Sequence, residues 1–552
     1  MRGHRVERLL AASGFALIAV GIVGATAQEA VRLAAIPAPL RGTQDTTAPA
    51  AATQTPAPPA NVTAIAPSAP AVDSEPAATP DPLASLDSAD RPIAERIRDL
   101  FAARSDRIFV TGKERMAAQA FYQKRNLAPL WLDKGHATVR AQSVIARLQR
   151  ADADGLEARD YRIPDFSGGP DALAEADLKL TQTVLMYARH VQAGRFSYKA
   201  ISRNIELPQA APDPAEVLAK VADTDDPAKA LDEFSPQHEG YQKLKAALAE
   251  LRGSAASNDH RIDAVIVNME RWRWYPRDLG TTHVIVNQPD FTLTVMHNGA
   301  RVWTTRVVIG KPSMQTPLLS ETMKHITINP TWNVPPSIVH NEYLPALARD
   351  PTVLRRMGLQ VHYGADGVSI TQPPGDRNAL GRVRFNFPNR FLVYQHDTPD
   401  KYMFAHDMRA ESHGCMRVQD PAKYAEVLLN IARPDEHWTA EKVKSIFGGA
   451  EQDVQLQPAP IWVHLTYQSA FVDEAGKLQM RRDVYNLDAR TLVAIKHERG
   501  TIDSDRRREP EVASYSPYRA SAASRSSRSY QPFFASAPSF LRPPRGLRRA
   551  YY

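Results

Sequence analysis

The segment RVWTTRVVIG at residues 301–310 concentrates Val, Thr, Ile and Trp and ends in glycine, a composition typical of a β-strand. Three neighbouring segments resemble it: HVIVN at 283–287, FTLTVMHNG at 291–299 and HITINPTWNV at 325–334. Short turns containing Gly, Asn or Pro bound these segments, so the chain alternates between extended and turn structure. This order predicts an antiparallel sheet.

A second set of strand-like segments follows. RFLVYQH at 390–396 and IWVHLTYQSAFVD at 461–473 lie on either side of PAKYAEVLLNIA at 421–432, which has the apolar spacing of a helix. The run FLVYQ is predicted to be a core strand that ends at His396. We therefore expect an α+β domain over residues 281–488, mostly antiparallel and β-sandwich-like, with its strands in one or two packed sheets.

Residues 89–274 are predicted to form a helical scaffold domain, because apolar residues recur there at helical spacing and Gly194 is suited to end a helix. The apolar stripes are interpreted as core. One stripe consists of Leu173, Leu180, Val184, Tyr187 and Val191, and another of Tyr241, Leu244, Leu248 and Leu251.

Residues 1–27 are predicted to be an export signal. They combine a basic start, an apolar run from Leu9 to Val23, and small residues at Ala25 and Ala27. The apolar run is nearly long enough to span a bilayer, so the segment is either cleaved or kept as an inner-membrane anchor. Both alternatives place the rest of the chain outside the cytoplasm.

Two regions have the composition of disordered chain. Residues 28–88 are rich in Ala, Pro and Thr and predict an extended linker, and many of the 43 prolines lie there. Residues 497–552 are rich in Ser, Pro, Arg and aromatic residues, and are either a solvated basic tail or an arm that binds an anionic polymer or a partner protein.

The overall charge is consistent with a cell-envelope protein. Lys and Arg number 68 against 61 Asp and Glu, a net charge of +7 that permits contact with anionic envelope surfaces. The sequence contains no zinc-finger spacing, homeodomain pattern or RNP-type aromatic motif, so we predict no nucleic-acid partner.

Cys415 is the one cysteine among 552 residues, and it lies in AHDMRAESHGCMRVQDP at 405–421. An exported protein meets oxidants, yet a single cysteine cannot form an internal disulfide. Cys415 is therefore a buried spectator, an intermolecular partner or a reactive thiol.

The residues around Cys415 supply what a nucleophile needs. Gly414 leaves room for a substrate carbonyl, and the amides of Gly414 and Cys415 could stabilise an oxyanion. His396, His406 and His413 are candidate bases, and His396 is favoured because its strand would hold the ring rigidly, whereas His406 lies in a polar connection.

A zinc site made by Cys415 and the three histidines is an alternative, but these residues lack the paired ligand spacing of zinc sites. A secreted cysteine protease would place its cysteine at the start of a helix and supply an Asn or Asp to orient the base.

These residues resemble the L,D-transpeptidases with a YkuD-type catalytic domain. The family signature, an upstream His followed by Ser/Thr-His-Gly-Cys, is matched by His396 and by Ser412 to Cys415. The resemblance covers about 269–488, including TINPTWNVPPSI and PPGDRNALGRVRFNFPN, and extends more loosely into the helical region. The chain resembles the large periplasmic members, but the short RGSAASNDHR stands where those members often carry a peptidoglycan-binding module, so we expect that module to be absent.

The resemblance implies a role for each site residue. Cys415 would be the nucleophile and His396 the proton acceptor and donor, with the backbone carbonyl of Asp397 orienting the imidazole. His413 and Gly414 would shape the catalytic loop. Substrate-binding positions would be Arg417, Ser412, Trp332 and Asp397, and no metal or other cofactor is expected.

The resemblance also implies the reaction. A stem tetrapeptide of peptidoglycan would acylate Cys415 and lose D-Ala, and a second stem would accept the acyl group to give a 3→3 cross-link in the periplasm. The alternatives are an L,D-carboxypeptidase with water as acceptor, attachment of an envelope protein to peptidoglycan, and a non-catalytic wall-binding scaffold.

Overall fold

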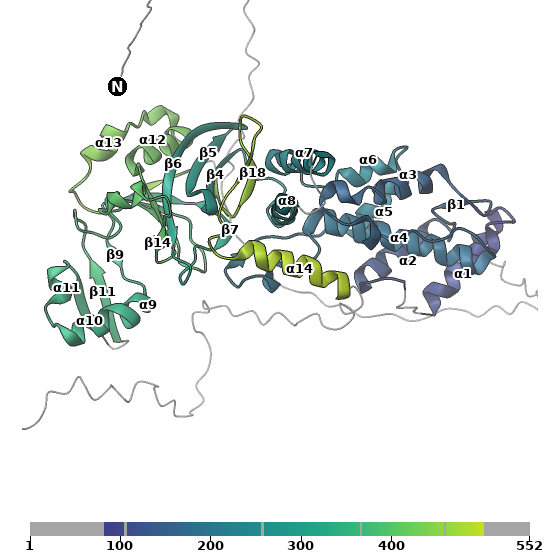
Figure 1. Ribbon diagram of the computed structural model, residues 1–552, viewed down its shortest axis with the longest axis horizontal. Helices are drawn as coiled ribbons and strands as arrows, with labels where there is room; N and C mark the ends of the chain where they lie inside the picture. The colour runs from purple at the N-terminus through teal and green to yellow at the C-terminus, as the bar shows by residue number, and fades with distance from the viewer. Residues whose placement is uncertain (1–81, 104–107, 255–258, 365–366, 458–459, 502–552) are drawn as a thin grey trace, which may run out of the picture. The chain divides into compact units, whose positions relative to one another are not determined.

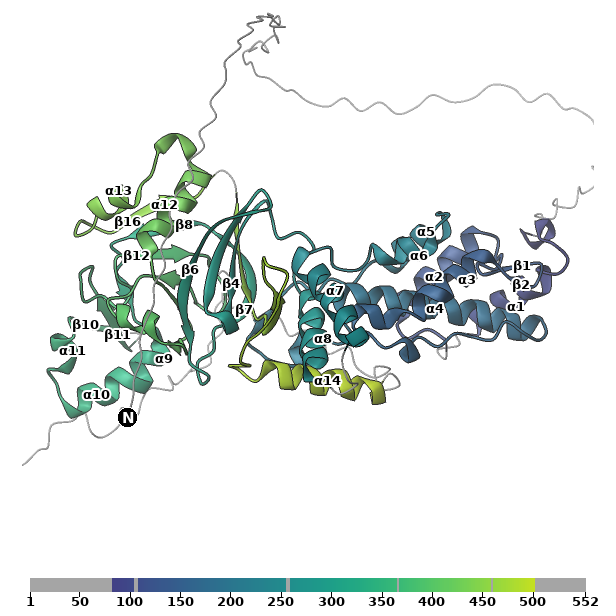
Figure 2. The same ribbon diagram turned by 45° about the horizontal axis from the view of Figure 1, so that its top comes forward.

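The computed structural model describes residues 82–103, 108–254, 259–364, 367–457 and 460–501 (Figure 1). The predicted export signal, most of the predicted linker and nearly all of the predicted tail lie outside these ranges. Within them, none of the helices is both long and apolar enough to cross a bilayer. The described residues form a helical region followed by a domain built on a curled sheet (Figure 2).

The helical region is organised around its longest helix, α4, which begins with a proline and ends before Gly194, a residue with φ of +91°. The apolar stripe predicted on this helix is buried, which confirms its interpretation as core. The helices of the region are α1 (Arg91–Ala102), α2 (Gly112–Lys124), α3 (Val139–Leu148), α4 (Pro170–Ala193), α5 (Pro214–Ala222) and α6 (Pro227–Asp232), with the short strands β1 (Leu132–Asp133), β2 (His136–Ala137) and β3 (Ile205–Glu206).

The next two helices, α7 (Glu239–Ser254) and α8 (His260–Trp272), are part of the sheet domain's core rather than of the helical region's core. The buried stripe of α7 belongs to the same apolar cluster as the sheet. At the end of α8, Asn268 donates to the Ser469 hydroxyl across 2.8 Å. The packing therefore assigns α7 and α8 to the core of the sheet domain, and the domain boundary at 274 stays a prediction.

Most strands belong to one twelve-stranded, largely antiparallel sheet, which confirms the predicted α+β class. Its order is β16-β8-β12-β13-β15-β6-β5-β4-β17-β7-β3, with β14 also paired to β6. The strands are β4 (Thr282–Asn287), β5 (Thr292–His297), β6 (Ala300–Gly310), β7 (Leu318–Met323), β8 (His325–Ile328), β12 (Val383–Asn386), β13 (Gln395–His396), β14 (Ala410–Ser412), β15 (Met416–Val418), β16 (Gln452–Gln455) and β17 (Ile461–Thr466).

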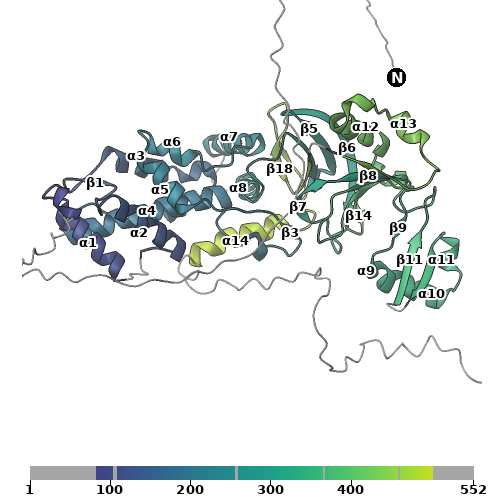
Figure 3. The same ribbon diagram turned by 180° about the vertical axis from the view of Figure 1, so that it is seen from behind.

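Helix α12 (Pro421–Ala432) occupies the predicted residues 421–432 and packs on this sheet with α13 (Ala440–Ser445) (Figure 3). The hairpin of β18 (Ala470–Val472) and β19 (Leu478–Met480) follows β17. The last element is α14 (Leu487–Thr501), so helix continues a few residues into the predicted tail. At the other end, a 3-10 turn at Pro82–Ser85 buries Leu83 within the predicted linker.

A small subdomain lies between β8 and β12 and has an apolar core of its own that includes Trp332, Ile338 and Leu380. Its elements are β9 (Trp332–Asn333), α9 (Pro336–Ile338), a π-helical turn (Val339–Tyr343), α10 (Leu344–Arg349), α11 (Val353–Arg356), β10 (Gln360–Gly364) and β11 (Gly367–Gln372). This subdomain forms one wall of the pocket described below.

The prediction that FLVYQ forms a core strand is wrong for most of that run. Strand β13 comprises residues 395–396 alone, and Leu392 has φ of +56° and an exposed fraction of 68%. The Asn389 side chain causes the turn, because its oxygen accepts hydrogen bonds from the amides of Phe391 and Val393.

Candidate active site

The register of β13 and β15 brings three predicted site residues and one that was not predicted onto the same face. The two strands are parallel, with His396 opposite Arg417 and Gln395 opposite Met416. Because side chains alternate along a strand, Tyr394 and His396 share a face with Cys415 and Arg417. All four line one pocket of about 480 Å³, whereas Gln395 and Met416 are buried on the opposite face.

Cys415 lies immediately before β15 in this pocket and is partly exposed. Its Sγ is 4.0 Å from the Leu392 carbonyl oxygen, and the Tyr394 side chain is in hydrogen-bonding contact with the thiol. Burial raises the pKa of Cys415 to about 11 although Tyr394, Arg417 and Arg384 all favour the thiolate. The resting cysteine is therefore a thiol near neutral pH.

His396 is held by its own neighbour in sequence. Its Nδ1 donates to the Asp397 carbonyl across 2.5 Å, which leaves Nε2 as the nitrogen that can accept a proton. The Asp397 carboxylate fixes this arrangement, because it accepts from the Arg382 amide at 2.8 Å and from Lys401 Nζ at 2.6 Å. Gly381 makes room for it: a Cβ there would lie 2.4 Å from Asp397 Cγ.

The electrostatic surroundings keep this imidazole neutral. Burial, together with the nearby positive charges of Arg417 and Arg384, lowers the pKa of His396 to about 3. Arg384 lies opposite His396 on β12, so cationic strands flank the histidine on both sides. With the pKa of the thiol raised and that of the imidazole lowered, the site favours general-base transfer of the proton during attack over a preformed thiolate.

The glycine loop leaves one amide for an oxyanion. The Gly414 amide already donates to Ser412 Oγ at 3.1 Å, while the Cys415 amide has no hydrogen bond within the described residues. The Gly414 carbonyl accepts from Thr316 Oγ1 at 2.7 Å. Because this carbonyl and the Cys415 N–H belong to one trans peptide unit, holding the oxygen toward Thr316 directs the N–H the other way.

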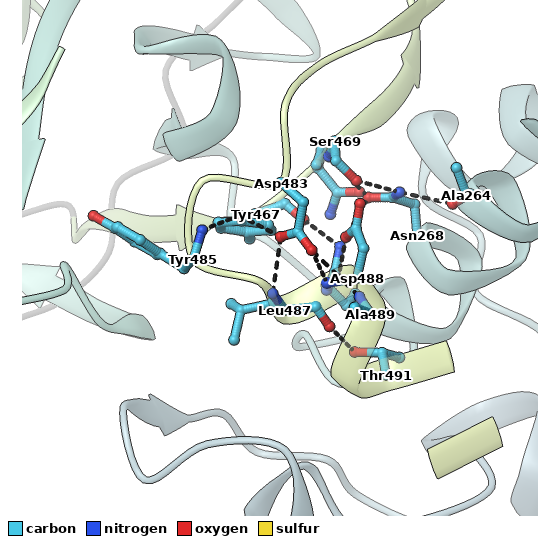
Figure 4. Close-up of polar contacts among 12 residues, drawn as sticks. Ala264, Asn268, Tyr467, Ser469, Asp483, Tyr485, Leu487, Asp488, Ala489 and Thr491 are labelled. Atoms are coloured by element: carbon cyan, nitrogen blue, oxygen red, sulfur yellow. Dashed lines mark hydrogen bonds and ion pairs between the residues drawn. The ribbon is translucent and has the colours of Figure 1, made fainter. Parts of the chain in front are cut away.

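A buried network supports Thr316 from behind. Thr316 Oγ1 accepts from the Gly310 amide at 2.9 Å, and the Tyr485 hydroxyl donates to the Gly310 carbonyl at 2.6 Å. In Figure 4, the Tyr467 hydroxyl joins the Tyr485 amide to the Asp483 carboxylate, at 2.8 Å and 2.7 Å. The loop at 412–415 is thus connected by hydrogen bonds to Asp483, whose carboxylate accepts from the first amides of α14.

The predicted residues His413 and Ser412 hold the loop in place. His413 Nε2 is 2.8 Å from the Glu342 carboxylate, which lies in the π-helical turn of the small subdomain. Ser412 Oγ donates to the Cys415 carbonyl at 2.6 Å as well as accepting from Gly414. Gly414 has φ of +116°, a conformation that other residues rarely adopt.

Of the remaining predicted residues, Arg417 and Trp332 line the pocket and His406 does not. Arg417 is 3.4 Å from Asp400 and contacts Met403, so its guanidinium holds the 400–405 segment while lining the pocket. Trp332 is 9% exposed and meets Tyr343 edge-on across the pocket wall. His406 is not among the lining residues and lies 2.7 Å from Glu411.

Sequence reasoning missed Tyr394, Thr316 and Tyr485. Tyr394 had a usable signal, because it lies two residues before His396 and shares its face in an extended chain. Thr316 lies 98 residues before Gly414, and Tyr485 lies 169 residues after Thr316, so no local pattern joins them.

Comparisons with known proteins indicate which family the catalytic region resembles. Residues 281–443 match the model of the L,D-transpeptidase catalytic domain, and residues 116–248 match that of a scaffold domain. The chain carries an L,D-transpeptidase catalytic domain. A Haemophilus influenzae relative named "Putative L,D-transpeptidase" is 24% identical over 397 residues, which are 68% of this chain and 78% of the relative.

Solved structures of L,D-transpeptidases are also similar to the chain. The Enterococcus faecium enzyme is 14% identical over 34% of this chain and 51% of its own, with a TM-score of 0.19. The Mycobacterium smegmatis enzyme is 16% identical over 34% of this chain and 59% of its own, with a TM-score of 0.16. The chain thus spans about half the length of the Enterococcus structure.

Proposed function

We propose that this protein is a cell-wall L,D-transpeptidase that forms 3→3 cross-links between peptidoglycan stem peptides through an acyl-enzyme on Cys415. The observation that carries the proposal is the shared face of β13 and β15, where His396, Cys415 and Arg417 open into one pocket. The match of residues 281–443 to the catalytic-domain model supports the same reaction.

In the first step, the Cys415 sulfur attacks the carbonyl between the third-position diamino acid and the terminal D-Ala of a tetrapeptide. His396 Nε2 takes the thiol proton as the sulfur–carbon bond forms, and the oxyanion accepts from the Cys415 amide. When the intermediate collapses, the carbon–nitrogen bond breaks and His396 gives its proton to the leaving D-Ala amine. A thioester remains on Cys415.

In the second step, the side-chain amine of another stem attacks the thioester. His396 removes a proton from this amine and returns it to the sulfur as the carbon–sulfur bond breaks. Arg417, on the pocket wall, is placed to meet a carboxylate of the substrate. The export signal at 1–27 would deliver the enzyme to the periplasm, where its substrate lies, as a free or membrane-tethered protein.

The test is to incubate the purified protein with disaccharide tetrapeptide and to identify the products by liquid chromatography and tandem mass spectrometry. The proposal predicts 3→3 dimers together with free D-Ala, and neither product with Cys415→Ala. Tripeptide and D-Ala without dimer would identify a carboxypeptidase. Intact substrate, with tight binding to whole peptidoglycan, would favour a wall-binding scaffold.

A further inference from the structure

A second cavity lies in the catalytic domain and shares no lining residue with the Cys415 pocket. The β18–β19 hairpin and helices α7 and α8 enclose about 810 Å³ over the exposed side of β4, β5 and β6. Figures 1 and 3 show β18 between α7 and these strands. We call this cavity the hairpin groove.

The floor of the hairpin groove mixes apolar and hydroxyl groups. It is made by alternate residues of the strands, among them Ile285, Thr294, Met296 and Thr304. Thr304 Oγ1 donates to the Leu293 carbonyl at 3.0 Å, and the two threonine hydroxyls lie 3.3 Å apart. Their protons are committed within the protein, which leaves oxygen lone pairs available to hydroxyl or amide donors of a ligand.

Three ion pairs account for six of the seven charged residues that line the groove, and the seventh, Asp473, accepts from the Gln479 side chain at 2.6 Å. Arg481 pairs with Asp290 at 2.5 Å, and Lys243 pairs with Glu239 at 2.7 Å. Arg301 likewise pairs with Glu474, also at 2.5 Å. Since each of these cations already has a carboxylate partner, the groove offers little attraction to a phosphate or to a strongly charged peptide.

The wall contains an unsatisfied amide. Gln468 is 5% exposed, and neither its side-chain oxygen nor its nitrogen has a hydrogen-bond partner within the described residues. Because an unpaired buried amide is unfavourable, a molecule entering the groove that can both donate and accept hydrogen bonds would be favoured there. A sugar ring, whose hydroxyls do both, fits this requirement.

We propose that the hairpin groove binds uncharged saccharide rings of the peptidoglycan glycan strand. The apolar floor suits the C–H faces of the rings, and the threonine oxygens and Gln468 suit their hydroxyl and acetamido groups. Because every cation of the lining is already paired, the groove suits an uncharged ligand. This role rests on the proposed function and extends it, because the glycan strand would bind at residues that do not line the Cys415 pocket. The groove thereby supplies wall affinity from within the catalytic domain.

The experiment measures binding of peptide-free glycan strands to the full chain by isothermal titration calorimetry. Thr294→Phe fills the floor without breaking an ion pair, and Thr322→Phe makes the same change on β7 outside the groove. We expect the wild type and Thr322→Phe to bind with Kd values within twofold of each other, and Thr294→Phe to bind at least tenfold more weakly. If Thr294→Phe does not fold, Met296→Trp fills the same floor.

Failure of this inference is distinguishable from failure of the proposed function. No binding of strands by the wild type, or equal binding by Thr294→Phe, would overturn the groove assignment. Displacement of the strands by free stem tetrapeptide would also overturn it, by identifying a peptide site. Acylation of Cys415 by tetrapeptide should be unchanged in Thr294→Phe, because the groove and the Cys415 pocket have separate linings.

Discussion

Replacing Thr316 by Val removes a hydroxyl while keeping the side chain's shape, and it tests how the catalytic loop is held. Thr316 is 1% exposed, and its Oγ1 both accepts from the Gly310 amide and donates to the Gly414 carbonyl. In the variant, the buried Gly310 amide loses its acceptor and the Gly414 carbonyl loses its donor. Nothing else in the side chain's packing needs to change.

The expected effect on stability follows from these two hydrogen bonds. A buried donor left unpaired costs roughly 1–3 kcal/mol, and a lost hydrogen bond roughly 1 kcal/mol, so the free energy of unfolding should fall by about 2–4 kcal/mol. Catalysis should fall too, because the peptide unit of Gly414 and Cys415 is then free to rotate and its N–H no longer has a fixed direction. One oxyanion donor is worth about 100- to 1000-fold, and partial misalignment should slow acylation about 10- to 100-fold.

The assay pairs urea unfolding with single-turnover acylation, followed by intact-protein mass spectrometry. Thr305→Val is the matched control, since Thr305 is 8% exposed on β6 and its hydroxyl has no hydrogen-bond partner within the described chain. The control should change the free energy of unfolding by less than about 1 kcal/mol and leave acylation unchanged. Acylation of Thr316→Val at the wild-type rate would refute the reasoning about the Gly414 peptide.

Further predictions concern ionisation and backbone space. Because burial raises the pKa of Cys415 to about 11, alkylation of this single thiol by iodoacetamide should keep accelerating above pH 9, and a plateau near pH 7 would instead indicate a thiolate–imidazolium pair. Because burial lowers the pKa of His396 to about 3, kcat/KM should show no His396 limb above about pH 4. As the pH falls, the histidine of the unfolded chain, with a pKa near 6.5, binds a proton before His396 of the folded protein does. Between about pH 6.5 and 3, the free energy of unfolding should therefore fall by up to about 1.4 kcal/mol per pH unit. His396→Gln should lose this pH dependence when unfolding is measured across the same range. Gly381→Ala should cost about 2–4 kcal/mol in urea unfolding, since the residue has φ of +61° and its Cβ would meet the Asp397 carboxylate, and a neutral effect would mean that the Asp397 segment is free to move.

The sequence predicted those parts of the fold that depend on local pattern. The strands from 283 to 334, the helix at 421–432 and the helix end at Gly194 all follow from composition, periodicity and glycine chemistry. The run at 391–394 failed because its apolar residues suggested a strand, while the side chain of Asn389 forms a turn that exposes Leu392. A short polar side chain outweighed the propensity of four apolar residues.

Residues of the candidate site could be predicted where their contacts lie close together in the sequence, and not where the contacts join distant segments. Cys415 and His396 are found from a motif, and the carbonyl that meets His396 is its next neighbour. The contact between His413 and Glu342 spans 71 residues and depends on how the small subdomain folds against the loop. The pairing of β13 with β15, which places Tyr394 beside Cys415, is likewise a matter of register that one sequence does not specify.

The measurement that tests the central claim most directly is the intact mass of the protein after incubation with disaccharide tetrapeptide, for the wild type, Cys415→Ala and His396→Ala. The account predicts a mass increase equal to the disaccharide tripeptide acyl group on the wild type, released D-Ala, and no increase with Cys415→Ala. With His396→Ala, the adduct should form far more slowly, because no base takes the thiol proton. A wild-type protein that stays unmodified while the substrate remains intact, or an adduct that persists in Cys415→Ala, would contradict the account.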